Sequence, residues 1–114
     1  MNEFYKNKAG LPREARNANS LRDAIIFWKE KRLLHVVKAC DGIDDAFRSD
    51  FGSLHKLFAN TVDRILDTDR GHLRERLEKW AIEMLEAFES SHSGAKHEAY
   101  GLCGAELEKI LSME

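Results

Sequence analysis

The chain has 114 residues, of which 43% are hydrophobic and 33% are charged, and its formal net charge is −2. This length suits one globular domain with a single core and leaves no room for a separate catalytic domain. The composition excludes a disordered or fibrous protein. The longest apolar run, Ala24–Trp28, has five residues. A membrane-spanning helix needs roughly 20, so we expect no membrane segment.

Residues 1–19 are predicted to form a polar, partly ordered N-terminal lead. They include the only proline, Pro12, and several Asn residues that disfavour a long helix. Phe4, Tyr5 and Leu11 are the apolar residues able to pin this lead onto the domain. The lead lacks the apolar middle of a signal peptide, which favours a cytoplasmic protein.

Two cysteines, Cys40 and Cys103, agree with a reducing compartment. Each lies among apolar neighbours at a helical position, and neither has another cysteine at CxxC spacing. A buried, reduced cysteine behaves as a small hydrophobic residue, and disulfides are rare in the cytoplasm. We therefore expect two free thiols with no role beyond packing, and no zinc or thiol-redox motif.

After residue 19 the apolar residues recur at helical spacing in four blocks, separated by short breaks rich in Gly, Asp and Ser. This pattern predicts an all-α fold in which residues 20–114 form a single domain, a small four-helix up-down bundle. Ser20 is expected to cap the first helix and Asp41-Gly42 to end it. The four helices are predicted over residues 20–40, 44–66, 70–90 and 95–112.

The later helices carry apolar stripes that predict the core. Gly52, inside the second helix, indicates a close approach to a neighbouring helix, and Trp80 in the third is expected to be buried. Asp67-Thr68-Asp69 is expected to cap the third helix. The inward residues are predicted to be Phe47, Phe51, Leu54, Phe58, Val62 and Ile65 in the second helix, and Ala99, Cys103, Leu107, Ile110 and Leu111 in the fourth.

The first helix is apolar nearly all round. On a wheel of about 100° per residue, Phe27 and Leu34 lie nearly opposite the main apolar face, which comprises Leu21, Ala24, Ile25, Trp28, Val36 and Ala39. One explanation is a central helix wrapped by the other three and the lead. The other is a second interface, either a homodimer seam or a partner surface, with aromatic and cationic anchors. The candidate interface residues are Phe27, Trp28, Lys31, Arg32 and Leu34.

Charge is unevenly distributed along the chain. Residues 1–40 carry nine Lys/Arg and four Asp/Glu, a net of +5, and residues 41–114 carry a net of −7. Either the basic half meets an acidic partner, or the two halves neutralise each other within one fold or across a dimer. Nucleic acid is not the expected partner, because Lys29, Lys31 and Arg32 do not share one helical face.

These features predict a non-enzymatic protein–protein interaction module that acts through its first helix. Adaptors, regulators and antitoxin- or immunity-like binding proteins are examples of such modules. The expected partner is another protein or a second copy of the chain, as a homodimer. Because fold does not imply function, the identity of the partner stays open.

Two carboxylate-x-x-His pairs match the ligand spacing of helical di-iron sites. They are Asp69 with His72 and Glu89 with His92. A continuous helix would separate the two pairs by roughly 30 Å. Two further inward carboxylates are also missing, because the predicted core stripes are apolar throughout. We therefore expect no metal and no cofactor.

His55 provides the alternative function. It lies midway along the predicted second helix, next to the apolar stripe, and in this respect the chain resembles histidine phosphotransfer domains, which are also small helical bundles. That family typically places Lys three and Gly four residues after the phosphorylated histidine, where this chain has Phe58 and Ala59. The resemblance implies a phosphotransfer protein centred on His55. Otherwise His55 is expected at the surface or at the edge of the core.

Overall fold

The computed structural model describes residues 11–16, 20–68 and 71–113, and every structural statement below concerns these ranges. Within them all regular structure is helical and no strand is present, which confirms the predicted all-α fold. The elements in chain order are α1 (Arg13–Arg16), α2 (Leu21–Trp28), a π-helical turn (Lys29–Leu33), α3 (Leu34–Cys40), α4 (Ala46–Thr68), α5 (Leu73–Ser90) and α6 (Gly94–Leu111).

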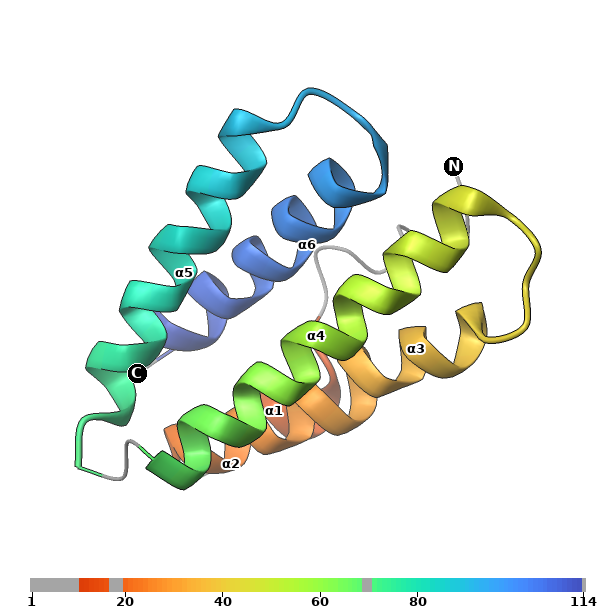
Figure 1. The fold of residues 1–114 in the computed structure, drawn as a ribbon. Helices are drawn as coiled ribbons and strands as arrows, with labels where there is room; N and C mark the ends of the chain where they lie inside the picture. The colour runs from red at the N-terminus through yellow and green to blue at the C-terminus, as the bar shows by residue number, and fades with distance from the viewer. Residues whose placement is uncertain (1–10, 17–19, 69–70, 114) are drawn as a thin grey trace.

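Two antiparallel helix pairs make up the bundle (Figure 1). α2, the π turn and α3 form one continuous rod, called the first helix below, and α4 returns beside it. α5 and α6 form the second pair, and α4 packs against α6 to join the pairs. The chain direction reverses from each long helix to the next, as expected for an up-down bundle. No helix in the described ranges is long and apolar enough to cross a membrane.

Part of the N-terminal lead packs on the bundle. Leu11 and Ala15 are buried, and α1 lies against α2. The carbonyl of Pro12 accepts the backbone N–H of Arg16 at 3.1 Å, which closes the single turn of α1. The predicted anchoring through Leu11 is therefore confirmed, whereas residues 1–10 lie outside the described ranges.

The helix ends follow local signals in most places. The Ser20 side chain accepts a hydrogen bond from the backbone N–H three residues on, at 3.1 Å. Gly42 follows the first helix with a φ of 73°, a conformation that glycine adopts without steric strain. The predicted cap of the third helix is wrong. Because α4 continues to Thr68, Asp67 and Thr68 lie in its last turn, and Asp69 is outside the described residues.

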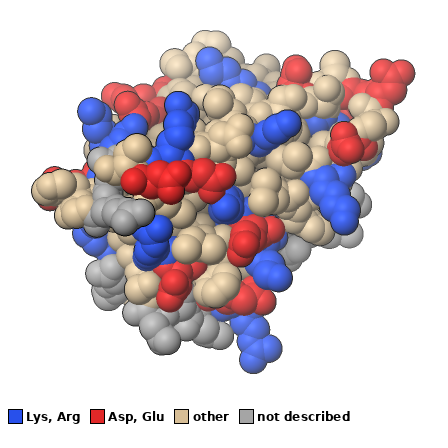
Figure 2. All heavy atoms as spheres, turned by 60° about the horizontal axis from the view of Figure 1, so that its bottom comes forward, with Lys and Arg blue, Asp and Glu red and all other residues tan. Residues whose placement is uncertain are grey.

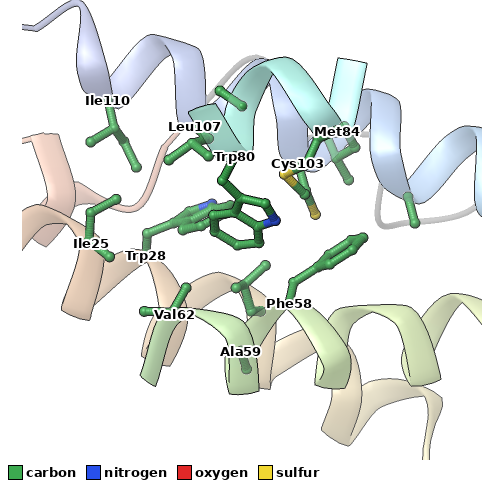
Figure 3. Packing of buried hydrophobic residues seen from close by; sticks show 14 of the residues in the cluster. Ile25, Trp28, Phe58, Ala59, Val62, Trp80, Met84, Cys103, Leu107 and Ile110 are labelled. Atoms are coloured by element: carbon green, nitrogen blue, oxygen red, sulfur yellow. The ribbon is translucent and has the colours of Figure 1, made fainter. Parts of the chain in front are cut away.

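The core lies between the two helix pairs and centres on two tryptophans. Trp80 is 7% exposed, as the stripe of the third helix predicted. Its ring meets Trp28 edge to face, with ring centroids 6.1 Å apart, and meets Phe58 in the same way at 6.3 Å. Figure 3 shows Trp28 on the first helix and Trp80 on α5 side by side, with Leu107 of α6 next to them. Aromatic pairs of this geometry stabilise a core beyond the area they bury.

The inward stripe of α4 differs from the predicted one at Leu54 and His55, and the predicted Phe47 is only partly buried. The observed stripe runs through Phe51, His55, Phe58 and Val62 at alternating spacings of four and three residues. Leu54, which was predicted to face inward, is only partly buried. The expectation of a surface or boundary position for His55 is therefore wrong, because its side chain occupies a core position of the stripe.

Gly52 marks a close helix–helix contact, as predicted. A Cβ atom at this position would lie 2.7 Å from the Cβ atom of Cys40 on α3, closer than real Cβ atoms approach. The backbone of α4 at Gly52 therefore packs directly against the Cys40 side chain of α3. At Gly101 of α6 a Cβ atom would lie 2.6 Å from the ring of Phe88 on α5, so this glycine makes room for an aromatic side chain.

Trp80→Ala is expected to lower the free energy of unfolding by roughly 3–5 kcal/mol, because it removes an indole from the middle of the core and leaves a cavity. Ile82→Ala, two residues along α5 at a side chain that is 60% exposed, is the matched control. It should change stability by less than about 0.5 kcal/mol. Urea unfolding followed by circular dichroism measures both, and equal effects would contradict the assigned core.

Candidate interaction site on the first helix

The π turn explains why the first helix is apolar nearly all round. Ala24, Ile25 and Trp28 are buried in α2, and the buried positions resume five residues later at Leu33. The backbone N–H of Leu34 donates to the carbonyl of Lys29, the five-residue hydrogen bond of a π-helix. One extra residue in a turn rotates all later residues by about 100° relative to an uninterrupted α-helix. The apolar residues of α2 and α3 therefore face the same core, although a regular wheel spreads them apart.

A buried carboxyl group anchors this part of the first helix to α6. Glu106 is 2% exposed, and its Oε1 accepts a hydrogen bond from the indole Nε1 of Trp28 at 3.0 Å. The Nε atom of Arg32, inside the π turn, lies 2.9 Å from Glu106 Oε2. The wide turn lets Arg32 and the apolar Leu33 both face the bundle. We call Trp28, Arg32 and Glu106 the anchor cluster.

Burial controls the electrostatics of the anchor cluster. Removing the Glu106 carboxyl group from water raises its pKa from 4.5 to about 7. The Arg32 cation and the hydrogen bond from Trp28 work in the opposite direction and favour the carboxylate. The carboxyl group therefore titrates near neutral pH, which an exposed glutamate does not do.

A second buried polar pair, His55 and Cys103, joins α4 to α6. His55 Nδ1 lies 2.8 Å from the carbonyl oxygen of Phe51, and its Nε2 lies 3.3 Å from the sulfur of Cys103. A ring N–H donates to the carbonyl, so Nε2 is left to accept the thiol S–H. Burial lowers the pKa of His55 to about 4 and raises the pKa of Cys103. Both groups are therefore neutral, the opposite of the thiolate–imidazolium pair of a reactive cysteine.

His55 does not have the exposure that phosphotransfer needs. The side chain is fully buried, and both ring nitrogens already contact protein atoms. A phosphodonor would have to open the core between α4 and α6 to reach either nitrogen. The geometry thus gives no support to the phosphotransfer alternative.

The five predicted interface residues fall into two groups. Trp28 is fully buried, and Arg32 is turned inward toward Glu106, with a side chain that is 14% exposed. Lys31 is exposed, Phe27 is half-buried, and Leu34 is 41% exposed. Only the second group can touch a partner directly. Trp28 and Arg32 instead hold the helix from inside.

Glu106 was missed by the sequence analysis, although a signal for it exists. The inward stripe of α6 passes through Ala99, Leu102, Cys103, Glu106, Leu107 and Ile110 at spacings of three, one, three, one and three residues. A carboxylate within such a stripe predicts a buried charge that must find a partner. The statement that the core stripes are apolar throughout is therefore wrong at Glu106, as it is at His55.

Charged side chains are interspersed on the underside of the bundle. Figure 2 turns that face forward and shows positive and negative groups mixed across it. Lys29 pairs with Asp63 of α4 at 2.8 Å. Of the three cations noted in the sequence, Lys29 and Arg32 thus have carboxylate partners within the chain. In the described ranges no group of three or more His, Cys, Asp or Glu residues is placed to hold a metal ion.

Comparison with known proteins gives no match: no family model, no curated protein and no solved structure is similar to this chain. What the chain does must therefore be inferred from its own residues and their geometry.

Arg32→Met is expected to lower the free energy of unfolding at pH 8 by roughly 1–2 kcal/mol, because Glu106 loses its cation and must take up a proton to stay buried. The double variant Arg32→Met/Glu106→Gln removes both charges and keeps an acceptor for the Trp28 indole. It should recover most of that loss. Urea unfolding of wild type, both single variants and the double variant measures the coupling. Losses that simply add would show that the two side chains do not interact.

Stability should depend on pH in a way that isolates Glu106. Between pH 4.5 and 7 the folded carboxyl group holds a proton that the unfolded chain has lost, so this group makes stability fall as pH rises. His55, with its pKa lowered from 6.5 to about 4, has the opposite effect between those values. In wild type the two slopes nearly cancel between pH 4.5 and 6.5, and Glu106→Gln should leave the rise due to His55 unopposed. A stability difference between wild type and Glu106→Gln that stays constant from pH 4 to 8 would contradict a buried, titrating Glu106.

Proposed function

We propose that this chain is a non-enzymatic protein-interaction module that binds a protein partner through the outer face of its first helix. The observation that carries the proposal is the exposure of Leu34. Its side chain is 41% exposed on a helix whose other large apolar residues are buried or partly buried. Burying one leucine against a partner stabilises a complex by roughly 1.5–3 kcal/mol.

The surroundings of Leu34 favour a protein surface as the partner. Lys31 and Lys38, three residues before it and four after it, are exposed. An apolar side chain ringed by charged groups is the arrangement of a small protein interface, with an apolar centre and a polar rim. Phe27 lies on α2, before the π turn, and the extra residue of that turn rotates it away from the side of the helix that carries Leu34. Trp28 and Arg32 support the same face from the interior.

The buried titratable groups argue for a binding role rather than catalysis. Within the described ranges, His55, Cys103 and Glu106 have shifted pKa values, and each of them is enclosed within the core. A catalytic acid, base or nucleophile must reach a substrate. These three side chains contact other parts of the chain and hold helices together.

A reducing compartment is the setting proposed for this module. Cys40 and Cys103 are both buried and are not joined to each other in a disulfide, as expected from the sequence. A buried thiol in apolar surroundings is inert and needs no oxidising environment. We therefore propose cytoplasmic residence.

Leu34→Glu should abolish partner binding without unfolding the protein, because it places a charge where the partner buries an apolar group. Ile82→Glu on α5 is the matched control, since Ile82 is even more exposed, at 60%, and lies on another helix. The measurement is affinity capture from cells of the source organism with wild type, Leu34→Glu and Ile82→Glu as baits. Circular dichroism checks that each bait is folded.

The expected result is a protein captured by wild type and by Ile82→Glu and lost with Leu34→Glu. A captured set that is the same for all three baits would contradict the proposed face. Loss with Ile82→Glu alone would move the interface to α5.

A further inference from the structure

Resting on the proposed function, we propose that the outer face of the first helix fits a second copy of this chain in antiparallel orientation. Leu34 lies on the two-fold axis of this dimer, and Glu30 of each protomer meets Lys38 of the other. The exposure of Leu34 alone defines neither the partner nor the orientation of binding.

Three exposed residues form the centre of the proposed interface. Glu30 lies four residues before Leu34 and Lys38 lies four residues after it, and all three are exposed. The π turn closes with the Leu34 N–H on the Lys29 carbonyl, so Glu30 stays about one turn behind Leu34. Lys38 is one α-helical turn ahead. The face therefore carries a negative group, an apolar group and a positive group in a row along the helix.

A two-fold axis through Leu34 makes this row complementary to itself. In a two-fold dimer the same patch of both subunits meets, and if the helices are antiparallel a residue four places before the axis meets one four places after it. Glu30 then faces Lys38 of the second copy at both ends of the contact, with two leucines between the ion pairs. A parallel arrangement would set Glu30 against Glu30 and Lys38 against Lys38, which repel.

The neighbouring positions agree with the same arrangement. Lys31, three places before the axis, faces the half-buried Val37, three places after it. None of the facing positions from 30 to 38 sets two like charges against each other. The helix carries both signs of charge in the order that antiparallel self-association requires.

Charge reversal tests the pairing. In light scattering or sedimentation equilibrium at low salt, wild type is expected to dimerise at tens to hundreds of micromolar, because the contact is small. Glu30→Lys alone and Lys38→Glu alone should each weaken self-association by about tenfold, since each creates two like-charge contacts. The double variant Glu30→Lys/Lys38→Glu should restore association to within about threefold of wild type, because opposite charges face each other again.

A mixture of the two single variants is the sharper test of the pairing. Each single variant repels itself, but together they restore opposite charges at both ends, so the mixture should form heterodimers. Glu86→Lys, a charge reversal at an exposed position on α5, is the control and should leave the dimer unchanged.

Three outcomes would overturn the proposal. Wild type that stays monomeric at several hundred micromolar excludes the second copy as partner. A dimer that survives both single reversals excludes the Glu30–Lys38 pairing, and a mixture that does not associate excludes the antiparallel orientation. The proposed function is tested separately. If another protein is captured through Leu34, the proposed function stands even when no dimer forms.

Discussion

The Glu106 carboxyl group, buried between the first helix and α6, is the constraint on which the rest of the arrangement depends. It takes a hydrogen bond from Trp28 and an ion pair from Arg32. Burying an ion pair adds little stability by itself, because the desolvation of both charges offsets their attraction. Such a pair instead fixes how the first helix is aligned with α6, since any other alignment leaves a charge buried alone. In this chain the alignment requires the π turn, which places Arg32 inward beside Leu33.

The register of the π turn decides which side chains α3 presents to solvent. Without the extra residue, α3 would be rotated by about 100°, and a different set of residues would face outward. With it, Val36 and Cys40 are buried, and Leu34 and Lys38 are exposed. The close contact of Gly52 with Cys40 fixes the same rotation from the side of α4. The proposed binding face is thus a consequence of contacts made on the opposite side of the same helix.

Much of the fold was predictable, because helices, caps and stripes are set by neighbouring residues. Ser20, Gly42 and Gly52 each act as their local sequence indicates. The π turn was not predictable, because a five-residue step in an apolar stripe looks the same as a helix that is apolar on two sides. Because of that ambiguity, Trp28 and Arg32 were predicted to be interface residues, although both point into the bundle. Glu106 was overlooked although its place in the apolar stripe of α6 marks it as buried, and His55 was expected at the surface or at the edge of the core. The partners of both lie on other helices, which the local sequence does not identify.

The hydrogen bond that closes the π turn is the most direct test, because the exposed face follows from it. Solution NMR on labelled protein detects the scalar coupling across a backbone hydrogen bond and so identifies donor and acceptor. The structure predicts a correlation between the Leu34 amide nitrogen and the Lys29 carbonyl carbon. A correlation of Leu34 with the Glu30 carbonyl carbon instead would mean a regular α-helix, with a different outer face, and would contradict the account.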